Sequence, residues 1–134
     1  MLDLSIGQLA RRAGVAIDTV RYYERQRLLA PAARRASGYR RYGDGELKRL
    51  RFIRRAKALG FTLADIRGLL SLSEQRSVPK IKRAAEAKLA DVERRLVELR
   101  QIRAGLRTLV AACPGHGRAD ACPILNALNE EEAT

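Results

Sequence analysis

The chain of 134 residues has no tryptophan and only four tyrosines, two phenylalanines, two cysteines and one histidine. No apolar run approaches the roughly 20 residues that a membrane-spanning helix needs. The first residues lack the basic and apolar segments of a secretory signal, so we expect a cytoplasmic protein. A membrane-surface helix is also disfavoured, because such helices carry Trp or Phe on the apolar face. Two cysteines in a reducing compartment do not predict a disulfide framework.

Positive charge is what the sequence has in excess, with a formal total of +12. Residues 1–68 contain 16 Lys and Arg against 6 Asp and Glu, whereas 11 basic and 9 acidic residues follow. The charges of a soluble domain usually come closer to balance. The first half therefore predicts a polyanionic partner, and nucleic acid is favoured over a membrane.

Two helices with a short connection are expected near the N-terminus. Ser5 and Gln8 have the spacing of a capping box, which predicts a helix from Ile6 to a stop at Gly14. Apolar residues at helical spacing predict a second helix over residues 15–28. A tight pair of this kind is a helix-turn-helix outline.

A short hairpin, or wing, is expected next, where Tyr39 and Tyr42 flank two arginines between glycines. Asp44 is expected to cap a third helix that stops at Gly60. A capping box at Thr62 and Asp65 predicts a fourth helix to about Leu72. The expected fold is all-α with a small β wing, and residues 1–72 form a winged helix-turn-helix DNA-binding domain.

A long helix is expected over residues 80–112, after a linker at 73–79. Its apolar residues recur in steps of three and four, which is the seam of a coiled coil. Such a rod would be roughly 45 Å long and needs a partner helix. We expect a homodimer through this helix, with packing across its own domain as the alternative. The seam comprises residues 81, 85, 89, 92, 96, 99, 102, 106 and 109.

Both cysteines lie in the segment expected to form a loop and C-terminal tail, residues 113–134. Cys113 and Cys122 share a stretch rich in proline and glycine, and His116 lies three residues after Cys113. Two thiolates suit a monovalent soft ion, and an added imidazole also suits zinc. A disulfide, inert thiols or a reversible thiol redox switch are the alternatives. Catalytic motifs are missing from the sequence, so we do not expect an enzyme.

Three stretches of the chain are distinctive together: IGQLARRAGVAIDTVRYYERQRLL, GYRRY and LKRLRFIRRAKALGFTLADIRGLL. They resemble the MerR family of bacterial transcription regulators, and the Cys113–Cys122 loop resembles the metal-responsive branch of that family. The resemblance implies a winged helix-turn-helix homodimer joined by an antiparallel coiled coil. It further implies that the metal-bound form distorts promoter DNA so that RNA polymerase can use two badly spaced promoter elements.

The resemblance also assigns roles to individual side chains. Those of the recognition helix are Asp18, Thr19, Arg21 and Tyr22. Asp18 departs from the basic or polar residue common there, and would read a cytosine amine or cap its own helix. On the wing, Tyr39 and Arg40 would contact phosphates.

The identity of the metal depends on the residue thirty-five positions before Cys113, which is Val78. Family members that sense divalent ions have a cysteine there, and copper-type members usually have serine. With only Cys113 and Cys122 as ligands, a monovalent ion, Cu(I), Ag(I) or Au(I), is favoured. A divalent ion such as Zn(II), Cd(II), Pb(II) or Hg(II), held by Cys113, His116 and Cys122 with Asp120 or water, is the alternative.

Overall fold

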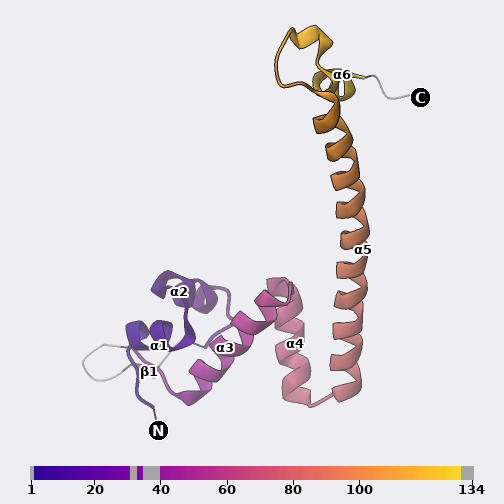
Figure 1. The fold of residues 1–134 in the computed structure, drawn as a ribbon. Coiled ribbons are helices and arrows are strands. Elements are labelled where there is room, and N and C mark those ends of the chain that lie inside the picture. Colours follow the sequence, from indigo (N-terminus) through magenta and orange to yellow (C-terminus); the bar gives the residue numbers. More distant parts are fainter. Residues whose placement is uncertain (1, 31–32, 35–39, 131–134) are drawn as a thin grey trace. The chain divides into compact units, whose positions relative to one another are not determined.

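The computed structural model describes residues 2–30, 33–34 and 40–130. The chain divides into two compact units, residues 1–85 and 86–134. The first unit contains α1 (Ile6–Ala13), α2 (Ile17–Arg25), α3 (Asp44–Ala58), α4 (Leu63–Gln75) and the short strands β1 (Ala33–Arg34) and β2 (Arg40–Arg41). Helix α5 (Val78–Ala112) begins there and continues into the second unit, which also contains η1 (Ala119–Ala121) and α6 (Pro123–Asn129). The expected class, helical with a small β wing, is confirmed (Figure 1).

The helix-turn-helix begins as the sequence predicts. Ser5 accepts a hydrogen bond from the Gln8 backbone N–H at 3.2 Å, and the Gln8 side chain accepts one from the Ser5 N–H at 2.9 Å. Helix α2 is shorter than the predicted 15–28. The Val15 N–H donates to the Ala10 carbonyl, 3.0 Å away, and so completes the end of α1. At the other end Arg27, with a φ of 58°, turns the chain out of the helix.

Gly14 is required where it stands, and replacing it provides a first prediction. Its φ is 71°, and a Cβ there would lie 2.9 Å from a guanidinium nitrogen of Arg54. We expect Gly14→Ala to lower the free energy of unfolding by about 1–2 kcal/mol, since L-residues are strained in this region. The measurement is urea denaturation at fixed protein concentration.

Gly68 is the matched control for that substitution. It lies inside α4, and a Cβ there would meet nothing within 4 Å. Gly68→Ala should therefore raise the free energy of unfolding by roughly 0.5–1 kcal/mol, because alanine has the better helix propensity. Equal effects of the two substitutions would contradict the assignment of Gly14 as the conformationally required residue.

The wing is an antiparallel pair of strands, in which Ala33 faces Arg41 and Arg34 faces Arg40. The predicted hairpin is therefore present, although Tyr39 lies outside the described residues. The prediction that Asp44 caps the third helix is wrong. Gly43 occupies the N-cap, and its N–H donates to a Glu46 carboxylate oxygen at 2.9 Å, which leaves Asp44 as the first helical residue.

Helices α4 and α5 are both longer than predicted, so little chain joins them. The Thr62–Asp65 capping box is confirmed, but α4 continues past Leu72 to Gln75. Arg76 then adopts a left-handed conformation with a φ of 53°, and α5 begins at Val78 rather than at residue 80. Only residues 76 and 77 lie between the two helices, where the sequence predicted a linker of seven residues.

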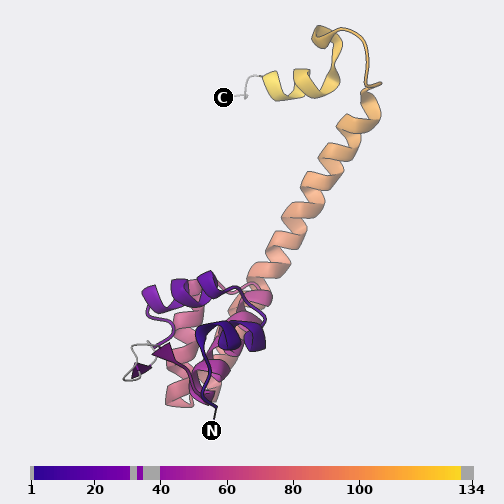
Figure 2. The ribbon, with the colours of Figure 1, turned by 90° about the vertical axis from the view of Figure 1, so that its left-hand side faces the viewer.

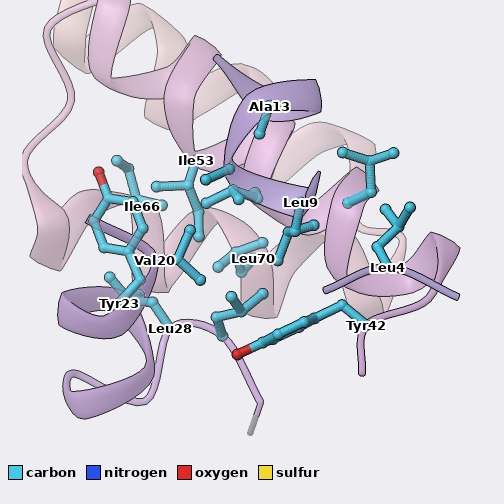
Figure 3. Close-up of a cluster of buried hydrophobic side chains, with 14 of the residues drawn as sticks. Leu4, Leu9, Ala13, Val20, Tyr23, Leu28, Tyr42, Ile53, Ile66 and Leu70 are labelled. Carbon is cyan, nitrogen blue, oxygen red and sulfur yellow. The ribbon is translucent and has the colours of Figure 1, made fainter. Parts of the chain in front are cut away.

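The core of the first unit is formed by all four of its helices and by the chain next to the wing. Leu9, Val20, Leu50, Ile53 and Ile66 are completely buried. Figure 3 shows side chains from these elements meeting in one cluster, with the Tyr42 ring at its edge. This packing holds α2 so that its other face is available to a partner.

Helix α5 leaves its predicted seam exposed in the single chain. Leu89, Leu99, Ile102 and Leu106 are each more than half exposed, and no α5 residue is buried. Seen from the direction of Figure 2, α5 is again one unbroken helix. Within the described ranges, no helix is both long enough and apolar enough to cross a membrane.

Candidate functional site

Helix α2 presents four polar or aromatic side chains on the face opposite the core. Val20 and Tyr23 are buried, whereas Arg21 and Tyr22 between them are exposed. This alternation follows from helical periodicity, which directs residues three and four apart to one side. The outward residues are Asp18, Arg21, Tyr22 and Arg25. Thr19, the other predicted contact, is half-buried at the edge of this face.

Asp18 is engaged with its neighbour on the helix. Its carboxylate lies 3.7 Å from the Arg21 guanidinium, and its side chain is 96% exposed. The prediction that Asp18 caps its own helix is wrong, because the N-cap residue is Ala16, which has no side-chain hydrogen bond, and Asp18 lies in the first turn of α2. An acidic group there interacts favourably with the N-terminal end of the helix dipole. Asp18 and Arg21 thus form a weak, solvent-exposed ion pair on this face.

Arg25 belongs to the same surface, although the sequence analysis did not select it. Its guanidinium lies 5.9 Å from the centre of the Tyr22 ring, a cation–π distance. The pair has the i, i+3 spacing that brings side chains together on a helix. That spacing was visible in the sequence and could have identified Arg25.

The base of the wing is tied to the N-terminal segment. Arg41 donates from Nε to a carboxylate oxygen of Asp3 at 2.8 Å and from a terminal nitrogen to the Asp3 carbonyl at 2.7 Å. Leu4 and Tyr42 exchange backbone hydrogen bonds of 2.8 Å in both directions. Arg40 lies on β2 beside Arg41. Arg41 thus braces the wing, while the contacts predicted for Tyr39 and for the Arg40 side chain stay predictions.

The turn after α2 is held by two arginines from other helices. Arg49 of α3 donates from Nε to the Leu28 carbonyl at 2.6 Å. Arg67 of α4 donates to the Gln26 carbonyl at 2.8 Å. Sequence reasoning missed both residues, because a contact between side chains and backbone over 21 or 41 positions leaves no local pattern.

The two cysteines meet at the end of α5. Their sulfur atoms lie 4.0 Å apart, and both thiols are free and half-buried. The chain returns on itself because Gly115 and Gly117 have φ values of 81° and 103°, which glycine adopts without strain. This separation is well beyond the roughly 2.05 Å of a disulfide bond. The loop therefore brings two thiols within reach of one ion.

The backbone of α6 favours the thiolate form of Cys122. A hydrogen bond from the Leu125 backbone N–H is the largest influence on the pKa of this thiol and lowers it, although burial acts in the opposite direction. Further hydrogen bonds from the Ile124 N–H and from Cys113 add to the lowering, so the net pKa falls below the ordinary value. Thiolates are the form in which cysteine ligates metals.

The sulfur separation fits a thiophilic ion. With metal–sulfur bonds of about 2.3 Å, the sulfurs would be ~4.6 Å apart in a linear site and ~3.8 Å apart in a tetrahedral one. The observed 4.0 Å lies between these limits, so small movements of the loop suffice for either geometry. Asp120 is paired with Arg118 at 3.2 Å, and His116 is exposed. Across the part of the chain that the structure describes, no group of three or more His, Cys, Asp or Glu side chains could hold a metal ion.

A helix-turn-helix with a wing, an outward arginine face and a long helix defines a DNA-binding regulator. Residues 4–73 match the family described as MerR HTH family regulatory protein, and residues 47–109 match the family described as MerR, DNA binding. The chain belongs to the MerR family of helix-turn-helix regulators, as its sequence predicts. It is a DNA-binding transcription regulator and not an enzyme.

Its relatives include the metal-responsive branch of that family. The chain is 40% identical to the HTH-type transcriptional regulator HmrR of Sinorhizobium medicae, over 91% of this chain and 84% of the relative. Identity to ZntR of Escherichia coli is also 40%, over 93% and 92% of the two chains. The crystal structure of PbrR691 from Ralstonia metallidurans in complex with lead(II) is similar with a TM-score of 0.80 and 35% identity, covering 93% of this chain and 98% of that one.

Proposed function

We propose that this regulator activates a metal-resistance or efflux promoter when a thiophilic ion binds Cys113 and Cys122. One observation carries the proposal: the two cysteines of a MerR-family chain lie with their sulfurs 4.0 Å apart in the loop that follows α5. A metal response is supported by the relatives, among which is a heavy metal-dependent transcription regulator of Rhizobium meliloti, 38% identical to this chain. As a regulator of bacterial promoter DNA, the protein acts in the cytoplasm.

DNA binding uses the outward face of α2 in the major groove and the wing on the backbone. Arg21 and Tyr22 are exposed there, with Asp18 paired with Arg21 and Thr19 at the edge. Tyr39 and Arg40 are the proposed wing contacts to phosphates. The net charge of +12 supports an electrostatic share of the affinity.

A second prediction concerns salt. We expect the logarithm of the DNA-binding constant to fall steeply and linearly with the logarithm of salt concentration, by about 0.9 for each phosphate contacted. Arg21→Ala should weaken binding. If Arg21 contacts a phosphate, the slope should decrease by about 0.9, and if Arg21 reads a base, the slope should stay unchanged. Fluorescence anisotropy with promoter duplexes measures both quantities. An affinity that hardly changes between low and moderate salt would contradict the proposed interface.

The regulator binds promoter DNA as a homodimer. The exposed apolar row of α5 provides the surface for a second copy, because a single chain leaves Leu99, Ile102 and Leu106 more than half exposed. A coiled-coil seam buries such a row against an identical helix. Two copies also supply two α2 helices, which matches the half-sites of a near-palindromic operator.

A monovalent ion, Cu(I), Ag(I) or Au(I), is the proposed inducer. Two thiolates satisfy a low-coordinate soft ion, whereas Zn(II) prefers four ligands. Val78 provides no ligand, and Asp120 is engaged with Arg118. Divalent ions are the alternative, since the similar structure of PbrR691 is a lead(II) complex and that of MerR from Bacillus megaterium, at 33% identity, is a mercury(II) complex.

The contribution of the chain's own residues to induction is to close the loop between α5 and α6. A bound ion would supply two metal–thiolate bonds, and Cys113 and Cys122 would hold it with the loop drawn closed. Cys113 follows directly on α5, and Cys122 directly precedes α6, so closure fixes the orientation of both helix ends. Metal binding favours one of two conformations of the regulator. In that conformation the regulator distorts the operator so that RNA polymerase uses both promoter elements.

X-ray absorption on protein loaded in competition between ions tests the identity of the inducer. Two sulfur neighbours in a linear site, with one ion per loop, are the expected result. Four neighbours that include an imidazole of His116 would replace this proposal with the divalent one. Failure to bind any tested ion, together with a reversible Cys113–Cys122 disulfide that tracks transcription, would identify a thiol redox regulator instead.

A further inference from the structure

The turn that ends the recognition helix is fastened to helices outside the helix-turn-helix. This turn, residues 26–29, follows α2 directly and contains Arg27 in a left-handed conformation. The Leu28 N–H donates to the Tyr23 carbonyl at 2.9 Å, and the Leu28 side chain is buried. Two of its carbonyls accept from guanidinium groups, that of Gln26 from Arg67 and that of Leu28 from Arg49. The orientation of α2 therefore depends on α3 and α4 as well as on α1.

Arg49 makes a second contact that reaches the end of α4. Its Nε donates to the Leu28 carbonyl at 2.6 Å, while another nitrogen of the same guanidinium lies 3.1 Å from a carboxylate oxygen of Glu74. The planar guanidinium presents donors in a fixed fork, so one side chain can serve both acceptors without changing shape. Lysine has no such fork.

Glu74 lies beside the junction between α4 and α5. Two residues further on, Arg76 leaves α4 in a left-handed conformation, and α5 begins at Val78. With only residues 76 and 77 between the helices, a change in the direction of α5 must be absorbed at this junction or passed into the last turn of α4. Glu74 is in that last turn, and Arg49 joins it to the turn that ends α2.

We propose that Arg49 is a positioning residue, which with Glu74 couples the α4–α5 junction to the recognition helix. This inference rests on the proposed function, because it assigns the path by which a change along α5 reaches α2. The ion pair itself adds little to stability, since the Glu74 side chain is 68% exposed and such pairs are weak. The role of Arg49 is to hold the Leu28 carbonyl in a fixed position relative to Glu74 at the end of α4.

A direct contact with DNA phosphate is the competing role for Arg49. The side chain lines a groove of about 540 Å³ together with Arg25 and Arg27. A phosphate contact would be removed with the guanidinium, and the salt dependence of binding would decrease by about 0.9 in slope. A positioning role changes affinity and leaves the slope as it was. The salt dependence of DNA binding by Arg49→Ala therefore distinguishes the two roles, which a loss of affinity alone would not.

Hydrogen exchange on the metal-free protein without DNA tests the coupling itself. Arg49→Ala should speed exchange of the Gln26, Leu28 and Leu29 amides by about fivefold, as expected from loss of a charge-assisted hydrogen bond. Glu74→Ala should speed exchange of the same amides although Glu74 touches none of them, and the double variant should match Arg49→Ala alone. Lys48→Ala, which removes an exposed charge from the adjacent position of α3, is the control and should leave these amides unchanged.

The outcomes distinguish this inference from the proposed function. If Glu74→Ala leaves the turn amides unchanged, or if the two effects simply add, the coupling is overturned even when the protein binds DNA and responds to metal. If the amides behave as expected but no metal changes transcription, the proposed function fails and the positioning role of Arg49 stands. A decrease in salt slope for Arg49→Ala, with unchanged exchange, would reassign Arg49 to phosphate binding.

Discussion

Replacing Cys113 and Cys122 together by serine should abolish the transcriptional response to metal while metal-free operator affinity stays within about twofold. Serine keeps the size and polarity of each side chain but supplies no thiolate, and soft ions bind hydroxyl groups poorly. The sulfurs lie in the second compact unit, whereas the proposed DNA contacts lie in the first. The measurement is in vitro transcription with and without metal, accompanied by anisotropy on the operator.

His116→Gln is the matched control for the loss of the thiols. Both thiolates stay in place in this variant, so a two-coordinate monovalent site should induce transcription as in the parent protein. A divalent site that uses the imidazole would lose affinity, since each added ligand contributes to holding zinc. A metal response that survives in the double serine variant would contradict the assignment of the loop as the sensor.

The largest expected loss of stability comes from Ile53→Ala in α3. Ile53 is completely buried in the cluster formed by all four helices of the first unit. Removing its side chain leaves a cavity in addition to the lost apolar burial, which costs about 2–5 kcal/mol of the free energy of unfolding. Such a loss is a large fraction of the stability of a small domain. Chemical denaturation at one fixed protein concentration measures it, because dimer stability depends on concentration.

Leu59→Ala is the comparison for Ile53→Ala. Leu59 follows the same helix but is 69% exposed, so its truncation removes little buried surface. We expect a change within about 0.5 kcal/mol, as for most surface substitutions. Similar losses for both variants would show that residue 59 is covered in the assembled protein.

The elements with local signals could be predicted from the sequence. Ser5 with Gln8 and Thr62 with Asp65 satisfy each other's backbone donors within one turn, so their helices begin at the predicted residues. The cap of α3 could not be found in this way, because Gly43 has no side chain to accept from the Glu46 backbone, and the only signal left is the Glu46 side chain that accepts from the Gly43 N–H. The spacing of the cysteines likewise predicted a shared loop, and their sulfurs do meet.

Helix ends and long-range contacts escaped prediction for physical reasons. Glycine is the usual residue in a left-handed conformation at a helix end, yet Arg27 and Arg76 adopt it here. After Arg27 the chain buries Leu28, and after Arg76 the Ser77 N–H donates to the Leu72 carbonyl at 3.2 Å, so both turns are completed by contacts that exist only in the folded chain. Arg49 and Arg67 look like any other exposed arginines in the sequence, and only the fold brings them to backbone carbonyls.

The exposed apolar row of α5 has a consequence for the cell that makes this protein. The row is separate from the thiols, so a copy without Cys113 and Cys122 still pairs with a normal copy. With equal synthesis of both forms and random pairing, about half of the molecules would be mixed and a further quarter fully thiol-free. If the proposed response needs the thiols of both chains, only the remaining quarter of the molecules would respond to metal.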